Sequence, residues 1–269
     1  MKPMGYLCHY CDICDGRGCI GELPGMGGAF ANRNFILNCA SWDEFPVNGE
    51  TDLPRIRLAP ITGAVENIGY PHEGMFYPDM IEAAVEAGID LSIGDGVPDE
   101  KLKYGIDALR CRGTRGAVFI KPYENYRIIE RMEWSSDVAE ILGIDIDSYN
   151  ILTMRNLARL ERKTTAQLRE LRRAADGKPF AIKGVFREED IEMVEEVHPD
   201  IVVISNHGGR IETRVGSTAE ALARWGGRLR KHAGEVWVDG GLRKRRDLLV
   251  AAGLGAATVM IGRPLISAL

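Results

Sequence analysis

The chain has 269 residues, of which 45% are hydrophobic and 27% are charged, so it can bury a sizeable apolar core. Its formal net charge of −5 argues against a general binder of nucleic acid or of anionic membranes, because such proteins need a basic surface. Its apolar runs stay well below the roughly 20 residues that span a bilayer, and its N-terminus does not resemble a signal segment. We therefore expect a cytoplasmic protein that binds neither nucleic acid nor membranes.

Residues 1–54 are rich in glycine and cysteine, and we expect them to wrap around the next domain as an extension, because they are too short for an independent core without a metal. Cys8, Cys11, Cys14 and Cys19 stand close together. In a reducing cytosol such spacing indicates a metal or redox site, and not a disulfide framework. The four thiols could ligate zinc or an iron–sulfur cluster, with free or redox-active thiols as the alternative.

From residue 55 to residue 269, short apolar runs alternate with longer amphipathic stretches. Short runs rich in β-branched residues are typical of strands buried on both faces of a parallel sheet. Eight strands are predicted, at residues 55–59, 90–93, 117–121, 143–147, 180–183, 201–204, 235–238 and 257–261. Seven helices are predicted, at residues 78–87, 99–109, 127–141, 164–175, 188–197, 217–231 and 244–252.

Strands that alternate with helices imply right-handed βαβ units, and eight such strands favour closure into a (β/α)₈ TIM barrel, an α/β fold. An open doubly wound sheet is the alternative. The chain ends at Leu269, soon after the eighth predicted strand, and no last helix is predicted there. We expect either a truncated chain or a partner that covers this flank, because a bare flank would expose apolar surface. We also expect a homo-oligomer.

Polar residues follow several of the predicted strands at their carboxyl ends, which is where barrels of this type carry their active sites. These residues are Asp145 and Asp147 near the end of the fourth strand, Lys183 at the end of the fifth, the run Ser205-Asn206-His207-Gly208-Gly209-Arg210 after the sixth, Asp239-Gly240-Gly241-Leu242-Arg243 after the seventh and Gly262-Arg263 after the eighth.

The last two of these segments predict a phosphate site. Glycines after Asp239 let a backbone approach a phosphate closely, and Arg243 and Arg263 can pair with its oxygens. The alternative is an ordinary turn followed by a solvated arginine. Lys183 closes a buried strand, where its ammonium needs either an anionic partner or a route to solvent.

The run around His207 predicts an acid–base site. Small neighbours leave the imidazole accessible, and a histidine can act as a general base near neutral pH. Arg210, three residues further on, can hold a carboxylate with two parallel hydrogen bonds. The alternative is a structural histidine with its hydrogen bonds satisfied.

These motifs resemble those of the FMN-dependent α-hydroxy acid oxidase and dehydrogenase family. The matching segments are residues 179–185, 205–210, 239–243 and 261–264, which occur in the family's order. The resemblance implies an FMN-dependent oxidation of a small 2-hydroxy acid to the 2-oxo acid, with His207 as the base and Arg210 as the carboxylate clamp. It implies an aspartate partner for His207, Asp147 first and Asp145 second. The residues it assigns to the cofactor are Lys183, Ser205, Asp239, Gly240, Gly241, Arg243, Gly262 and Arg263.

The sequence departs from the family in three places. At the third predicted strand, where the family has a Gln-x-Tyr pattern, either Lys121 or Tyr123 takes its place. After Arg210, where the family continues Gln-Leu-Asp, this sequence has Ile211. The cysteine cluster is the third departure. Two other functions are therefore considered, a flavin-binding redox or electron-transfer protein with a cysteine-ligated metal centre, and a non-oxidising FMN isomerase. The motifs select neither a particular hydroxy acid nor oxygen over another electron acceptor.

Overall fold

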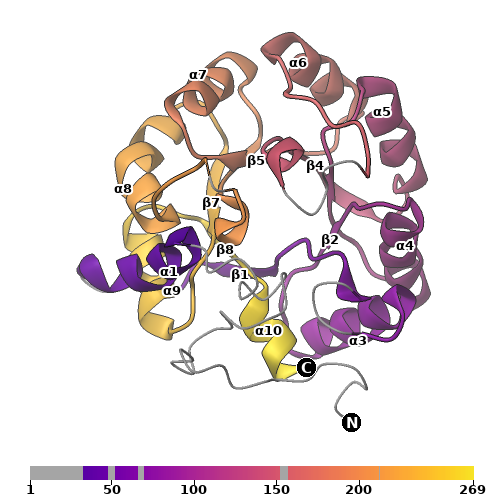
Figure 1. The fold of residues 1–269 in the computed structure, drawn as a ribbon, viewed down its shortest axis with the longest axis horizontal. Helices are drawn as coiled ribbons and strands as arrows, with labels where there is room; N and C mark the ends of the chain where they lie inside the picture. The colour runs from indigo at the N-terminus through magenta and orange to yellow at the C-terminus, as the bar shows by residue number, and fades with distance from the viewer. Residues whose placement is uncertain (1–32, 48–51, 66–69, 152–156, 212) are drawn as a thin grey trace.

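The computed structural model describes residues 33–47, 52–65, 70–151, 157–211 and 213–269. Eight parallel strands stand at the centre, and helices surround them (Figure 1). Neighbouring strands follow the order β1-β8-β7-β6-β5-β4-β3-β2. Their bounds are β1 (Arg55–Leu58), β2 (Ser92–Gly94), β3 (Gly116–Ile120), β4 (Ala139–Asp145), β5 (Phe180–Val185), β6 (Ile201–Ile204), β7 (Glu235–Asp239) and β8 (Thr258–Ile261).

The ring of strands closes between β1 and β2. Arg57 and Asp90 form a parallel bridge there, just before β2 begins. The amide of Leu58 donates to the Asp90 carbonyl at 2.7 Å, and the amide of Asp90 donates to the Ile56 carbonyl at 3.1 Å. An open doubly wound sheet has two free edges and cannot make this bridge. The predicted (β/α)₈ barrel is therefore confirmed.

The strands are largely buried on both faces, and the two faces pack differently. Inside the barrel a small apolar cluster, which includes Phe119, Val203, Trp237 and Met260, fills the axis. A larger apolar core lies between the outer faces of the strands and the helices. This double burial explains why the strands appear in the sequence as uninterrupted apolar runs and not as alternating ones.

The helices form the outer ring. Their bounds are α3 (Glu73–Glu86), α4 (Glu100–Arg112), α5 (Asn125–Trp134), α6 (Thr165–Ala174), α7 (Glu188–Val197), α8 (Thr218–Leu229), α9 (Arg245–Gly253) and α10 (Arg263–Ala268). The predicted helix at 127–141 is wrong at its C-terminal end, because α5 ends at Trp134 and β4 begins at Ala139. There Ile141 pairs with Ala117 and Leu142 with Val118, so pairing with the neighbouring strand overrides the helical spacing.

Two further differences from the sequence prediction are larger than three residues. The helix predicted to begin at Pro78 begins five residues earlier, because the His72 ring accepts a hydrogen bond from the Gly74 amide at 3.0 Å and caps α3. After β8, where no helix was predicted, the six-residue α10 lies between α9 and α3 in the ring (Figure 1). Its Ile266 is 7% exposed and packs into the outer core.

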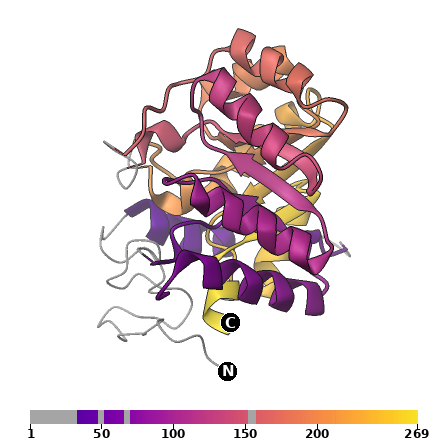
Figure 2. The same cartoon turned by 90° about the vertical axis from the view of Figure 1, so that its right-hand side faces the viewer.

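Upstream of the barrel lie α1 (Arg33–Ala40) and the short 3₁₀ helix η3 (Ser41–Glu44). Figure 2 shows α1 at one end of the barrel, on the side of the loops that follow the strands. No helix in the described ranges has the length and the apolar character needed to cross a membrane.

Candidate functional site

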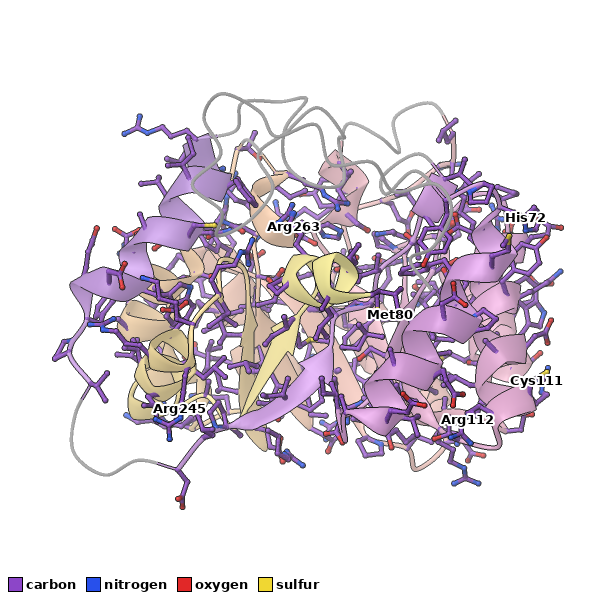
Figure 3. All side chains as sticks on the ribbon, turned by 90° about the horizontal axis from the view of Figure 1, so that it is seen from below. His72, Met80, Cys111, Arg112, Arg245 and Arg263 are labelled. Atoms are coloured by element: carbon purple, nitrogen blue, oxygen red, sulfur yellow. The ribbon has the colours of Figure 1, made fainter. Side chains whose placement is uncertain are left out.

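A cavity of about 360 Å³ opens at the carboxyl ends of the strands. Figure 3 shows Arg263 at this end of the barrel and Arg112, the last residue of α4, at the other. The structure brings most of the sequence-predicted site residues to the wall of this cavity: Lys183, His207, Arg210, Asp239, Gly240, Gly241, Arg243, Gly262 and Arg263. The other three, Asp145, Asp147 and Ser205, are buried behind it.

The histidine lies in a tight loop after β6. The short 3₁₀ helix η6 (His207–Gly209) begins there, and the Asn206 side chain caps it by accepting from the Gly209 amide at 2.9 Å. The His207 amide donates to the Ser205 hydroxyl at 3.1 Å. The loop holds His207 at a φ of 59°, in the left-handed region that non-glycine residues rarely adopt. The backbone is therefore fixed in a costly conformation that orients the ring.

The imidazole contacts two buried carboxylates. Its Nδ1 lies 3.2 Å from Asp147 Oδ1 and 3.6 Å from Asp145 Oδ2. The shorter contact agrees with Asp147 as the first choice of partner. When Asp147 accepts the Nδ1 hydrogen, Nε2 is left as the basic nitrogen of the ring.

Asp145 lies at the centre of a buried ion-pair network. One of its oxygens contacts Lys121 Nζ at 3.0 Å and the other contacts Lys183 Nζ at 3.1 Å. Burial would raise the pKa of Asp145, but the protonated form of His207 first, and then the two lysines, hold that pKa well below its ordinary range. Asp145 is therefore a carboxylate at neutral pH.

Lys183 also contacts Asp239 Oδ2 at 3.4 Å and the Ser205 hydroxyl at 3.3 Å. Burial would lower the pKa of Lys183, but the carboxylates around it, Asp145 foremost, raise that pKa above its ordinary value. Of the two alternatives that the sequence left for Lys183, an anionic partner or a route to solvent, the structure shows the anionic partner.

The same surroundings keep the histidine neutral. Burial lowers the pKa of His207; the carboxylates of Asp145 and Asp147 raise it, the two lysines lower it, and the net direction is downward. At neutral pH the ring is therefore unprotonated and able to accept a proton. This is the state that a general base requires before it acts.

Positive charge gathers where the loops after β6, β7 and β8 line the cavity. Burial lowers the pKa of the Arg263 guanidinium, and the nearby charges of Arg210 and Arg243 lower it further. Arg263 Nη2 donates to the Gly208 carbonyl at 3.3 Å, and its guanidinium carbon lies 4.4 Å from the centre of the Phe35 ring. Three guanidiniums brought this close together favour a bound anion.

Unpaired buried atoms at this end fit an FMN molecule. Within the described ranges, Nε and Nη2 of Arg243 have no hydrogen-bond partner, although both are buried. The same holds for Asp239 Oδ1, a carboxylate oxygen at the edge of the cavity. A phosphate group would satisfy the two donors, and a ribityl hydroxyl would satisfy the acceptor. The donor set therefore suits the phosphate and sugar-alcohol parts of FMN.

The glycines after β7 have a structural task that the sequence did not reveal. Gly240 and Gly241 have φ angles of 91° and 78°, which favour glycine. A Cβ on Gly241 would lie 1.7 Å from the Asn38 carbonyl oxygen. Both glycines line the cavity, but it is the backbone of α1, at Asn38, that leaves no room for a side chain at Gly241.

Of the two candidates on the third strand, Lys121 lines the cavity and Tyr123 packs beneath the Arg131 guanidinium, 4.3 Å from its carbon atom. The backbone directly after β3 is fixed by contacts with the buried side chain of Asp95. The Lys121 amide donates to Asp95 Oδ2 at 3.1 Å, and Arg131 Nε lies 3.2 Å from the same oxygen. Lys121 could have been assigned from the sequence by the argument used for Lys183, since each is the last residue of a predicted strand.

The cysteines predicted to bind metal, Cys8, Cys11, Cys14 and Cys19, lie outside the described residues, and that site stays a prediction. Among the described residues, Asp145, Asp147 and His207 offer ligand atoms within 4.8 Å of one another. The two lysines already pair with both oxygens of Asp145, so its charge is satisfied inside the protein without a cation.

Curated proteins match part of this chain. Bovine (Bos taurus) 2-hydroxyacid oxidase 2 is 35% identical over 88 residues, which are 33% of this chain and 25% of that protein. The Saccharomyces cerevisiae L-lactate dehydrogenase (cytochrome) is 36% identical over 121 residues, 44% of this chain and 18% of the yeast protein. The matched stretch thus spans a quarter or less of these curated relatives.

The fold is shared with solved structures as well. Mandelate oxidase with (S)-2-phenylpropionate superposes with a TM-score of 0.62 at 21% identity, over 87% of this chain and 76% of that one. The model of the FMN-dependent dehydrogenase family matches residues 121–269, which is more than half of the sequence. This chain therefore belongs to the FMN-dependent dehydrogenase family.

Proposed function

We propose that the protein oxidises a small 2-hydroxy acid to the corresponding 2-oxo acid with FMN bound in the cavity. One observation carries the proposal: His207, with Asp147 Oδ1 3.2 Å from its Nδ1, opens into the same cavity as Arg210. A base and a carboxylate-binding group on one short loop match the two ends of a 2-hydroxy acid. The membership of the family and the names of the relatives support the same reaction class.

Each residue has a distinct part in the proposed reaction. Arg210 holds the substrate carboxylate with its planar guanidinium and thereby orients the α-carbon and its hydroxyl toward His207. His207 accepts the hydroxyl proton on Nε2, and the Asp147 carboxylate stabilises the imidazolium that forms. When bound, FMN supplies the acceptor for the two electrons and the α-hydrogen of the substrate. Arg243 and Arg263 would hold its phosphate, and Lys183 would stand beside its ring as a fixed positive charge.

An anaerobic screen of lactate, glycolate and larger 2-hydroxy acids tests the proposal through bleaching of the flavin absorbance. We expect at least one acid to bleach it, and His207→Ala to slow bleaching by about 10²–10⁴-fold, the usual contribution of a general base. His232→Ala, a histidine outside the cavity, is the control and should leave the rate unchanged. Arg210→Lys should raise KM sharply, because an ammonium cannot form the paired hydrogen bonds of a guanidinium.

Two outcomes would contradict the proposal. If the protein binds FMN but no 2-hydroxy acid bleaches it, the electron-transfer and isomerase alternatives are favoured. If His207→Ala bleaches at the wild-type rate, a different group accepts the proton.

A further inference from the structure

A segment upstream of the barrel contacts the loops that carry the site. Residues 33–44, comprising α1 and η3, are here called the clasp. They lie outside residues 121–269, the part that matches the family. The clasp turns its buried side chains, including Asn34, Phe35, Asn38 and Trp42, toward the barrel. Its position in the sequence therefore gives no hint that it touches the residues around His207.

The strongest contact is a reciprocal pair of amide side chains. Asn38 Nδ2 donates to Asn206 Oδ1 at 2.7 Å, and Asn206 Nδ2 donates to Asn38 Oδ1 at 3.1 Å. Both side chains are 0% exposed. Asn38 Oδ1 also accepts from the Thr218 amide at 3.0 Å, where α8 begins. Asn38 thus joins the residue that precedes His207 to the far end of the same loop.

The clasp reaches the neighbouring loops as well. Trp42 Nε1 donates to the Gly240 carbonyl at 2.9 Å, after β7. A Cβ on Gly209 would lie 2.6 Å from the Phe35 amide nitrogen, so α1 presses directly on the histidine loop. The Phe35 ring faces the Arg263 guanidinium, after β8. The clasp therefore contacts the loop of His207, the glycine loop after β7 and Arg263 after β8.

We propose that Asn38 is a positioning residue, which fixes the loop of His207 and Arg210 in register with the phosphate end of the cavity. The inference rests on the proposed function, since it assigns Asn38 a task in that reaction. Its physical basis is that a buried amide has a narrow choice of partners, and leaving one unpaired is costly. A base displaced by about 1 Å can lose about 10²-fold in rate, so a fixed loop matters for catalysis.

Asn38→Ala tests the proposal in the full chain with FMN bound, and Ile36→Ala is the matched control, because Ile36 lies on the same helix and is 53% exposed. In Asn38→Ala we expect the backbone amide hydrogens of Thr218 and Gly209 to exchange with solvent at least about tenfold faster than in the wild type, because local opening of the loop becomes easier. Flavin reduction at saturating 2-hydroxy acid should fall about tenfold, whereas the Kd for FMN should change less than about threefold. Ile36→Ala should change neither.

A double-mutant cycle separates positioning from general loosening. If Asn38 acts through Asn206, the variant with both Asn38→Ala and Asn206→Ala should be no slower than the slower single variant. The proposal would be overturned if the losses in the rate of flavin reduction of the two single variants multiplied in the double variant. It would also be overturned if Asn38→Ala changed neither the amide hydrogen exchange nor the rate of flavin reduction. Asn38→Ser, which keeps a hydroxyl in the buried site, takes the place of Asn38→Ala if the latter does not fold.

Failure of the inference is distinguishable from failure of the proposed function. If no 2-hydroxy acid bleaches the wild-type flavin, the proposed function fails. The amide exchange of Thr218 and Gly209 then still decides whether Asn38 holds the loop. If the wild type is bleached and Asn38→Ala behaves like Ile36→Ala in every measurement, the inference alone is wrong.

Discussion

The two ends of the cavity handle buried charge in opposite ways. At the His207 end, Asp145 pairs with Lys121 and Lys183, and Lys183 also pairs with Asp239. At the other end, Arg243 keeps two buried nitrogen atoms without a hydrogen-bond partner within the described residues, and like charges crowd Arg263. The first end pairs its lysines with carboxylates inside the protein, although Asp147 Oδ2 has no hydrogen-bond partner among the described residues, and the second end offers hydrogen-bond donors to an anion.

This difference separates binding from chemistry. Groups that are paired and fixed before a ligand arrives cost no reorganisation when charge develops in a transition state. Groups that repel one another without a ligand gain the most when an anion binds among them. We therefore expect the His207 end to contribute to the stability of the folded protein and the arginine end to contribute to ligand affinity.

Lys183→Met should give the largest effect on stability. The change removes the ammonium that Asp145 and Asp239 share, and breaking a buried ion pair usually costs about 3–5 kcal/mol. Because Asp145 keeps Lys121 and Asp239 keeps Ser205, we expect a loss of about 3 kcal/mol, measured by urea unfolding of the FMN-free protein. Lys231→Met, at an exposed lysine, is the control. A loss equal to that of the control would mean that the network contributes nothing.

Arg243→Met should instead act on FMN affinity. A hydrogen bond to a charged group contributes about 1.5–3 kcal/mol, which corresponds to a rise in the Kd for FMN of about 10- to 100-fold. The FMN-free protein should be as stable as the wild type or more so, because two unpaired buried donors are removed. Fluorescence titration with FMN measures the first effect and urea unfolding the second. The neighbouring exposed Arg245→Met should leave both unchanged, and a lower stability for Arg243→Met would contradict the comparison.

Lys121→Met should give the smallest effect, seen in the pH dependence of flavin reduction. Protonated His207 cannot accept a proton, so the rate falls as pH drops through the pKa of His207, which lies below its ordinary value of about 6.5. Removing Lys121 removes a positive charge that lowers this pKa, so the acidic limb should move to higher pH by up to about one unit. Lys103→Met, at an exposed lysine, is the control. If the acidic limb of the pH profile stays in place or moves to lower pH, the charge of Lys121 does not lower the pKa of His207.

The sequence predicted most strands to within two residues, but it missed the start of β4, the start of α3, the end of α5 and the whole of α10. The strand at residues 201–204 was predicted with the bounds of β6, because a four-residue apolar run between polar neighbours leaves no other choice. The end of α5 was missed, because the apolar residues at 139–142 suit a helix face as well as a buried strand. Periodicity cannot separate the two in so short a segment; the pairing of β4 with β3 does.

The motifs at the strand ends placed most of the candidate site residues at one end of the molecule, and the family resemblance put Asp147 ahead of Asp145 as the partner of His207. They could not show that Asp145 is shared by two lysines, because ion pairs between strands depend on register around the barrel. They could not show the clasp either, because Asn38 and Asn206 are separated by 168 positions in the chain.

By itself the sequence determined the alternation of strands and helices, the carboxyl-end motifs and hence the type of site, since these depend on local spacing and residue chemistry. Only the tertiary structure decided the closure of the barrel at Arg57 and Asp90, the pairing of buried charges and the position of α1 against the loops. The reason is physical: those features arise from contacts between distant segments, and their energies depend on distance and burial, which exist only once the chain has folded.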